Sequence, residues 1–288
     1  MGQSIPEITT KRRSFYIKRL LRNKGANVSL IFVMVLFIWP MLWLVFASFD
    51  ANAPLRVRIP EKFTLDNYRE VLTNGSNYRS FLNSFILSFS QATLVVILSI
   101  LASYPLSRYN IKGKGTLMYS LLFLTGLPIT AIMVPVYMVF FELKIINSLI
   151  STTLFLVSTA LPYSIWMMKN FLDDVPITLE EAAWIDGAST LQTIRHIILP
   201  AILPGLLVVF IFTFSGSWGN FFVPFILISS VEKMPASVAI YQFFGAYGTV
   251  QFGQLAAFSL LYTLPIAGLY ILSQRFMSNG FSLGGSIK

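Results

Sequence analysis

The stretch EEAAWIDGASTLQTIRHIILPAILPG, residues 180–205, interrupts a chain that is otherwise strongly apolar. Its charged and titratable residues are Glu180, Glu181, Asp186, Arg195 and His196, the last being the chain's one histidine. Long hydrophobic blocks precede and follow its charged part, and the second of these blocks starts directly after Pro200. A polar, helix-forming segment between two such blocks indicates a surface loop that connects membrane-embedded helices.

The overall composition is that of a membrane protein. Hydrophobic residues make up 55% of the 288 residues, charged residues make up only 11%, and the mean hydropathy is +0.70. Soluble domains carry about 25% charged residues. The net charge of +9 fits basic loops on one side of a membrane better than a nucleic-acid-binding face. Because the chain has no cysteine, disulfides and Cys-ligated zinc are excluded.

Six hydrophobic blocks are long enough to cross a bilayer, which needs about 20 apolar residues per helix. They span 28–49, 82–104, 117–140, 148–168, 201–229 and 254–274, and none contains Asp, Glu, Lys, Arg or His. Prolines in the third and fourth blocks predict kinked helices. Most Lys and Arg residues fall on the side of the N-terminal arm, so the positive-inside rule predicts that both termini are cytoplasmic. We therefore predict an all-α membrane protein with six transmembrane helices.

The predicted spans divide the chain into four parts. These are a basic cytoplasmic arm over 1–27, a first transmembrane helix with an extracellular loop over 28–81, a transmembrane core over 82–275 that includes the loop 176–200, and a cytoplasmic tail over 276–288. The basic arm is interpreted as an orientation signal that contacts lipid headgroups, and no nucleic-acid partner is expected.

The sequence offers no residues for catalysis or ion coupling. Ionisable groups inside membrane spans are the usual sign of proton or ion coupling, and the six blocks have none. The nearest match to a P-loop, Gly113-Lys114-Gly115-Thr116, lacks the required spacing. His196 has no Ser or Cys partner nearby and no metal-ligand spacing, so we expect no catalytic residue, metal or cofactor in this chain. Energy for uphill transport would have to come from another subunit.

Residues 176–200 are predicted to form two short helices joined by a glycine turn. Thr178 and Glu181 have the spacing of a capping box, and Ser189 with Gln192 repeats that spacing. Gly187 suits the left-handed position at which a helix stops. Exposed carboxylates on the first helix would suit a partner's arginines. A hairpin that only closes the end of the bundle remains equally open on these residues alone.

A specific resemblance favours a hairpin that binds a partner protein over one that only closes the end of the bundle. Glu181-Ala182-Ala183, three residues, Gly187, nine residues, then Ile197-x-Leu199-Pro200 resembles the EAA loop of permease subunits in binding-protein-dependent ABC importers. The resemblance extends over nearly the whole chain and is greatest to the smaller permease of maltose-type importers. Further matching elements are Phe63 to Tyr68, Asn83-Ser84, Ala102-x-Tyr104, Arg108 and Trp218-Gly219-Asn220-Phe221.

The resemblance implies a type I, MetI-like fold and an ATP-driven sugar importer in a prokaryotic cell membrane. The implied partners are a second permease, two ATPase subunits that bind ATP and Mg²⁺, and an extracytoplasmic solute-binding protein. The loop would be the coupling helix that contacts the ATPase, and the implied residues are Glu180, Glu181, Ala182, Ala183, Asp186, Gly187, Leu199 and Pro200. The alternatives are an importer for a non-sugar solute and an energy-independent channel or scaffold, which would not co-purify with an ATPase.

A sugar path is predicted where aromatic rings combine with hydroxyl and amide groups. The candidate residues are Tyr163, Phe214, Ser217, Trp218, Asn220 and Tyr262. The alternative is ordinary helix packing, because small polar residues are common at membrane helix interfaces and aromatic residues gather at the bilayer boundary. The resemblance implies that specificity for one sugar lies mostly in the binding protein and the partner permease.

Overall fold

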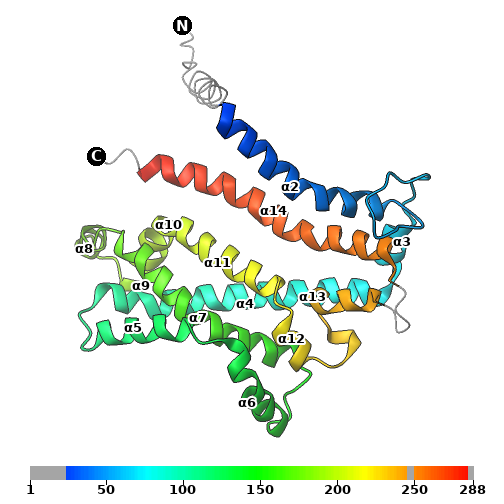
Figure 1. Ribbon diagram of the computed structural model, residues 1–288. Helices are drawn as coiled ribbons and strands as arrows, with labels where there is room; N and C mark the ends of the chain where they lie inside the picture. The colour runs from blue at the N-terminus through cyan, green and yellow to red at the C-terminus, as the bar shows by residue number, and fades with distance from the viewer. Residues whose placement is uncertain (1–23, 245–249, 285–288) are drawn as a thin grey trace.

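The computed structural model describes residues 24–244 and 250–284, which are almost entirely helical (Figure 1). Most of the predicted basic arm over 1–27 and the last residues of the predicted tail lie outside the described residues. Strand-like pairing within the described ranges is limited to two isolated bridges, Asp50 with Phe63 and Phe244 with Val250. The all-α prediction is therefore confirmed.

The longer helices account for most of the predicted spans. In chain order the helices are α2 (Lys24–Ser48), α3 (Asp66–Thr73), α4 (Gly75–Arg108), α5 (Lys114–Thr125), α6 (Ile129–Glu142), α7 (Leu149–Asp173), α8 (Thr178–Ile185), α9 (Thr190–Thr193), α10 (Leu199–Ala201), α11 (Leu203–Trp218), α12 (Phe222–Leu227), α13 (Ala236–Ala239) and α14 (Phe252–Gly284). Four of them, α2, α4, α7 and α14, are long and apolar enough to cross a membrane by themselves. Counting each of two bent helix pairs as one span gives up to six.

Two predicted spans are broken: the third, for which a kink was predicted, and the fifth, for which none was. The third block bends by 90° between α5 and α6, where Pro128 precedes the new helix with an extended backbone. The fifth block, 201–229, ends as a helix at Trp218. After this break the side chain of Asn220 accepts a hydrogen bond from the backbone N–H of Val223 at 3.1 Å, which starts the short helix α12.

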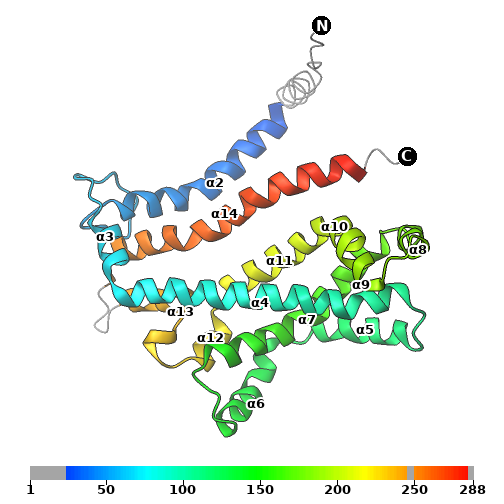
Figure 2. The same cartoon turned by 180° about the vertical axis from the view of Figure 1, so that it is seen from behind.

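The helices form a bundle with an outlying pair. Helices α4, α7 and α11 pack together, while α2 and α14 run side by side next to them (Figures 1 and 2). Trp43 of α2 meets Phe252 of α14 edge to face, with ring centroids 6.1 Å apart. Helix α8 and the C-terminal end of α14 lie at one end of the bundle, and α3 lies at the other.

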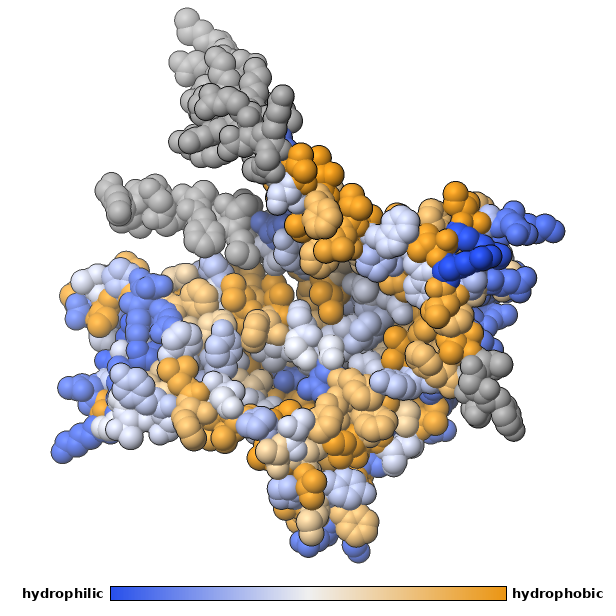
Figure 3. Space-filling model, in the orientation of Figure 1, coloured by the Kyte–Doolittle hydropathy of each residue, from blue (hydrophilic) through white to orange (hydrophobic). Residues whose placement is uncertain are grey.

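The surface has the pattern expected of a membrane-embedded bundle. In Figure 3 hydrophilic residues gather at the two ends, at α8 and at the connection from α2 to α3, and hydrophobic residues dominate between them. The side chains of α2 from Val28 to Met41 are largely exposed despite being apolar. Exposed apolar residues at this density require lipid or another protein to cover them.

The packing face of α4 is built from small polar residues at helical spacing. Its buried polar residues are Asn77, Ser80, Asn83, Ser84, Ser88, Gln91, Ser99 and Ser103. Ser84 accepts a hydrogen bond from the backbone N–H of Ala236 at 2.7 Å. Asn83 donates to the carbonyls of Glu232 and Met234. Such residues let helices approach closely and satisfy backbone groups of neighbouring segments inside a membrane.

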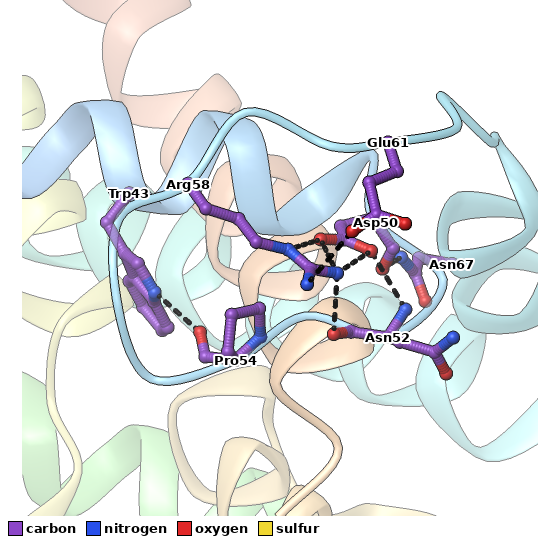
Figure 4. A network of polar contacts seen from close by, with 7 residues as sticks. All are labelled: Trp43, Asp50, Asn52, Pro54, Arg58, Glu61 and Asn67. Atoms are coloured by element: carbon purple, nitrogen blue, oxygen red, sulfur yellow. Dashed lines mark hydrogen bonds and ion pairs between the residues drawn. The ribbon is translucent and has the colours of Figure 1, made fainter.

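The connection between α2 and α3 is held by a polar network at the far end of the bundle (Figure 4). Asp50 forms an ion pair with Arg58 at 2.9 Å and accepts a hydrogen bond from the N–H of Asn52 at 3.0 Å. Trp43 donates from its indole N–H to the carbonyl of Pro54 at 3.0 Å. This loop therefore has a defined shape without regular secondary structure.

Asn67 explains part of the 63–68 element noted in the sequence. Its buried amide donates to the carbonyls of Ser48 and Asp50, at 3.1 and 3.0 Å, and so ties α3 to the end of α2. A β-carbon at Gly253 would lie 2.6 Å from this amide. Glycine is therefore required there for α14 to pack against α3.

Candidate functional site

Residues 178–201, hereafter the surface hairpin, form two helical arms joined by a turn at one end of the bundle (Figure 1). The first arm, α8, starts differently from the sequence prediction. No side-chain capping bond is present at its N-terminus, and the residue in the capping position is Ile177. The reason is that a helical turn already begins at Pro176, whose carbonyl accepts the N–H of Leu179 at 3.2 Å. Thr178 therefore lies inside the first turn, and the predicted capping box at Thr178 is wrong.

The turn and the second arm follow the prediction. Gly187 has φ of +86°. The N–H of Ala188 donates to the carbonyl of Ala183 at 2.9 Å, and that of Gly187 donates to Trp184 at 3.0 Å. This pair of bonds is a Schellman motif, in which a left-handed glycine satisfies the last carbonyls of a helix. The predicted capping box between Ser189 and Gln192 is present, with bonds in both directions.

The second arm contains a π-helical turn at Ile194–Ile198, directly before Pro200. Proline has no N–H and its ring crowds the carbonyl four residues earlier, so the wider turn relieves a contact that an α-helix would create. Ile198 is fully buried, and Leu199 packs against the same cluster as Ile202. Pro200 itself is exposed.

Three side chains, Tyr104, Arg108 and Glu180, fasten the surface hairpin to α4, and we call them the hairpin anchor. Arg108 forms an ion pair with Glu180 through its Nε, and the two side chains are 7% and 1% exposed. Tyr104 lies one turn before Arg108 and donates its hydroxyl hydrogen to the other Glu180 oxygen at 2.8 Å. A carboxylate with both oxygens occupied by buried donors is held rigidly.

Further bonds join the same end of α4 to α7. Arg108 also donates to the carbonyl of Val175 at 3.1 Å. Ser107 donates to Asp173 at 2.6 Å, and Asp173 forms an ion pair with Lys169. The carboxyl ends of α4 and α7 and the start of the surface hairpin therefore form one connected polar cluster.

The position of Glu180 differs from the expectation that its carboxylate faces a partner. Its carboxylate is occupied within the chain by Arg108 and Tyr104, and the residue has no exposed surface. Glu181 and Asp186 are exposed. Because consecutive residues on a helix point about 100° apart, only one of the two adjacent glutamates is able to face the bundle.

The exposed surface of the surface hairpin, which we call its outer face, is apolar as well as charged. Its large exposed hydrophobic residues are Leu179 (46%), Trp184 (43%), Ile185 (86%) and Leu191 (75%). Ala182 is exposed beside them, while Ala183 is buried against the bundle. A face that mixes large apolar side chains with carboxylates is typical of a protein interface rather than of a lipid-facing surface.

His196 has a local structural partner. Its exposed ring Nδ1 lies 3.0 Å from the carbonyl of Gln192, one turn earlier. Among the described residues, no group of three or more His, Cys, Asp or Glu side chains is placed to hold a metal ion.

A cavity of about 600 Å³ that opens to the surface of the chain lies beside the bend between α5 and α6. Its walls come from α4, α5, α6, α7 and α11, and half of its lining residues carry hydroxyl or amide groups. The polar ones are Gln91, Thr125, Ser158, Thr159, Tyr163, Ser164, Thr213, Ser217 and Asn220. Volume and composition match those of small-molecule sites, which range over roughly 300–1,000 Å³.

The structure divides the six predicted sugar-path residues into two groups. Tyr163, Ser217 and Asn220 line the cavity. Phe214, Trp218 and Tyr262 instead belong to a packed aromatic cluster and do not line it.

Hydrogen bonds and ring stacking hold the aromatic cluster together. Trp218 donates its indole N–H to the carbonyl of Tyr262 at 3.0 Å, and the Tyr262 hydroxyl donates back to the carbonyl of Trp218. The rings of Phe214 and Trp218 stack with centroids 5.7 Å apart. These contacts lock α11 against α14.

Most of the cavity lining was missed by the sequence reasoning, and Gln91 and Phe212 are two examples. Gln91 lies at the centre of α4, and Phe212 lies against Tyr163 with ring centroids 5.3 Å apart. The helical spacing of small polar residues before and after Gln91 was the available signal, because it marks the face of α4 that packs inward. No comparable signal distinguishes Phe212 from the other phenylalanines of α11.

A bundle of membrane-length helices with a partly polar cavity and an interface-type hairpin at one end is the architecture expected of a subunit of a membrane transport system. The comparison with protein families identifies which one. The chain belongs to the family described as the binding-protein-dependent transport system inner membrane component, whose model matches residues 95–279. The matched range includes the surface hairpin, the hairpin anchor and all of the cavity lining except Gln91.

Individual relatives agree with this assignment. The chain is 28% identical to the inner membrane ABC transporter permease protein YcjP of Escherichia coli over 93% of this chain and 98% of the relative. It is also 28% identical to the trehalose/maltose transport system permease protein MalG of Thermococcus litoralis, over 94% and 98% of the two chains. Among solved structures, a bacterial ABC transporter involved in import of the acidic polysaccharide alginate matches with a TM-score of 0.76 at 18% identity, covering 96% and 99%.

Proposed function

We propose that this chain is a permease subunit of an ATP-driven sugar importer, and that it forms the translocation path together with a second permease. Support comes from the family and from relatives whose names include a trehalose/maltose permease. A solute-binding protein would deliver sugar from outside, as the family description implies. Two ATPase subunits would bind ATP and Mg²⁺.

The observation that carries this proposal is the surface hairpin. It is anchored to the bundle on its inner face and exposes large apolar side chains next to Glu181 and Asp186 on its outer face. Lipid would suit the apolar side chains but not the carboxylates. A protein partner with basic residues around an apolar groove suits both, and we assign this partner as the ATPase subunit.

The membrane orientation follows from the same assignment. ATP is cytoplasmic, so the surface hairpin and the C-terminal end of α14 would face the cytoplasm. The density of Lys and Arg in the N-terminal arm gives the same orientation by the positive-inside rule. The loop between α2 and α3 would then face the binding protein on the outside.

Transport would proceed by alternating access. Closure of the two ATPase subunits would move the surface hairpin, and the hairpin anchor would transmit that movement to α4 and α7. Both helices line the cavity, so their movement would change the side to which the cavity opens. The energy would come from ATP binding and hydrolysis in the partner subunits.

The test is co-purification of the assembled complex after a change on the outer face of the surface hairpin. Ile185 is 86% exposed, so Ile185→Asp should leave the fold intact and release the ATPase. Leu55 is 74% exposed at the opposite end of the bundle, so Leu55→Asp is the matched control and should retain the ATPase. Retention of the ATPase by both variants would contradict the docking assignment. Absence of any ATPase from the complex of the unaltered chain would favour a channel or scaffold.

A further inference from the structure

Residues 228–236, hereafter the strap, connect the end of α12 to the first residue of α13, toward the end of the bundle where α3 lies (Figures 1 and 2). Within the strap only Val231–Lys233 forms a short helical turn. The backbone N–H and C=O groups of an irregular segment need partners wherever water is excluded. In the strap, side chains from two other parts of the chain supply such partners.

The first attachment of the strap is to α4. Asn83 is 8% exposed, and its amide donates through Nδ2 to the carbonyls of Glu232 at 2.9 Å and Met234 at 3.2 Å. Its neighbour Ser84 is 2% exposed and accepts the backbone N–H of Ala236 at 2.7 Å through its hydroxyl oxygen. All three bonds reach backbone groups, so α4 fixes the path of the strap independently of the side chains that the strap carries.

The second attachment is to Asn147, in the connection between α6 and α7. Its side-chain oxygen accepts the backbone N–H groups of Ser229 and Ser230, at 3.2 and 3.1 Å, and the Ser230 hydroxyl at 2.9 Å. Its backbone N–H donates to the carbonyl of Leu227 at 2.8 Å, and Lys233 donates through Nζ to its carbonyl at 2.9 Å. Asn147 has φ of +58°, a conformation that asparagine adopts more readily than most residues. One residue therefore binds the strap from its start to its helical turn.

The strap is also connected to the wall of the cavity. Ser237, directly after the strap, donates its hydroxyl hydrogen to the carbonyl of Asn220 at 2.9 Å. Asn220 lines the cavity and lies at the break between α11 and α12. Helices α4 and α7 supply further lining residues. The strap and its two attachments therefore join three elements of the cavity wall.

We propose that Asn83, Ser84 and Asn147 are positioning residues for transport, which hold α4, the start of α7 and the break after α11 together so that they move as one body. The inference rests on the proposed function, in which the surface hairpin moves α4 and α7 at their other end. Helices that are fastened at one end only are able to splay apart at the other. Because the strap removes this freedom, a movement imposed by the surface hairpin reaches Asn220 instead of being lost as splaying.

The opposite hydrogen-bond roles of the two asparagines give a specific test. Asn83 holds the strap through a donor, whereas Asn147 holds it through an acceptor. An ionised aspartate only accepts hydrogen bonds. Asn147→Asp therefore keeps the bonds and tolerates the left-handed backbone, and the ammonium group of Lys233 offsets the added charge. Asn83→Asp instead directs a carboxylate at two carbonyls and loses both bonds.

The experiment measures sugar uptake by the assembled complex in proteoliposomes, per mole of complex, over a range of binding-protein concentrations. Maltose, trehalose and cellobiose are the probes, and one that the unaltered complex imports is used. Asn83→Asp should lower maximal uptake by about 10-fold, since each of two lost hydrogen bonds corresponds to about 3-fold or more, and leave the half-saturating binding-protein concentration unchanged. Asn147→Asp should retain uptake, whereas Asn147→Gly, which keeps the left-handed backbone but removes the acceptor, should lower it. Asn52→Asp, exposed and outside the strap, is the control for added charge.

A distance measurement tests the movement itself. The chain has no cysteine, so Val231→Cys on the strap and Leu101→Cys on α4, both at exposed positions, accept one spin label each. The distance between the labels should be the same without nucleotide and with ATP trapped on the ATPase. Adding Asn83→Asp should make this distance differ between the two states, and adding Asn147→Asp should not.

The possible failures are distinguishable. Equal uptake by Asn83→Asp and Asn147→Asp would overturn the positioning role, and so would a label distance that changes with ATP in the otherwise unaltered chain. A raised half-saturating concentration of binding protein at unchanged maximal uptake would overturn it in favour of a docking surface. A smaller amount of complex with unchanged uptake per mole would overturn it in favour of a role in folding alone. An unaltered complex that imports none of the three sugars would instead contradict the proposed function, and the label distances would still test the strap.

Discussion

Replacing Glu180 by glutamine tests the hairpin anchor directly. The change keeps the shape of the side chain and removes its charge, which leaves Arg108 as a buried cation without a counter-charge. The two side chains are 1% and 7% exposed, so water is unable to compensate. Breaking one partner of a buried ion pair costs about 3–5 kcal/mol. We expect the lower end of that range, because the pair lies at the end of α4 rather than at the bundle centre.

The measurement is the free energy of unfolding of the chain in mixed micelles. Asp186→Asn, in the same surface hairpin but exposed, is the matched control, and its effect should stay within about 0.5 kcal/mol. The double variant Glu180→Gln with Arg108→Met removes both charges and should recover a large part of the loss. Equal stability of Glu180→Gln and Asp186→Asn would refute the anchor.

The functional readout follows from the proposed coupling role. If Glu180 positions the surface hairpin, loosening it should leave the ATPase bound but raise the number of ATP molecules hydrolysed for each sugar imported. A role confined to folding would lower the amount of complex without changing that ratio. Measuring ATP hydrolysis and sugar uptake on the same proteoliposomes separates the two.

Other changes probe local geometry, each read as the free energy of unfolding. Gly205→Ala would place a β-carbon 2.4 Å from the Phe171 ring and should cost about 1–3 kcal/mol, whereas Gly268→Ala, with open space around it, should not destabilise. No difference between them would contradict the close packing of α11 on α7. Gly187→Ala should cost about 1 kcal/mol, because its φ of +86° suits glycine alone; an unchanged value would argue against the left-handed turn. Tyr104→Phe removes one buried hydrogen bond to Glu180 and should cost about 1 kcal/mol, with transport retained. A loss as large as that of Glu180→Gln would contradict the view that the ion pair with Arg108 contributes more to the anchor than this hydrogen bond.

Local sequence signals predicted the surface hairpin well. A glycine stop, a capping box and a proline act within a few residues, so the turn at Gly187 and the box at Ser189 have the predicted form. The capping box at Thr178 failed for a local reason too, since the helical turn that begins at Pro176 takes over the start of the helix. The confirmed predictions and the wrong one all depended on residues that are neighbours in sequence.

The hairpin anchor was beyond such signals. Arg108 and Glu180 are separated by 72 positions, and their contact depends on how α4 and α7 pack. Two adjacent glutamates look equivalent in sequence, yet Glu180 is buried and Glu181 is exposed. The family resemblance marks Glu181 within its motif, and only the folded chain gives Glu180 a different role.

The sequence also did not predict which face of α11 lines the cavity. Ser217 and Asn220 were predicted for their hydroxyl and amide groups, and both line the cavity. Phe214 and Trp218 were predicted for their aromatic rings, but they lie one turn apart on the face of α11 that stacks against Tyr262. Composition located the right segment, and the rotation of the helix, which tertiary packing sets, decided which side chains meet the cavity.

Helix α4 joins the two parts of the site. Gln91 lines the cavity and Arg108 holds the surface hairpin, and their positions along the helix place them about 25 Å apart at 1.5 Å per residue. Because they share no contact, the stability losses of Gln91→Met and Glu180→Gln should add to within about 0.5 kcal/mol. Their effects on uptake should not add if α4 moves as one rigid element, since a loosened anchor would already release the cavity from control by the ATPase. Additive losses in both measurements would mean that α4 is a scaffold and that movement reaches the cavity by another helix.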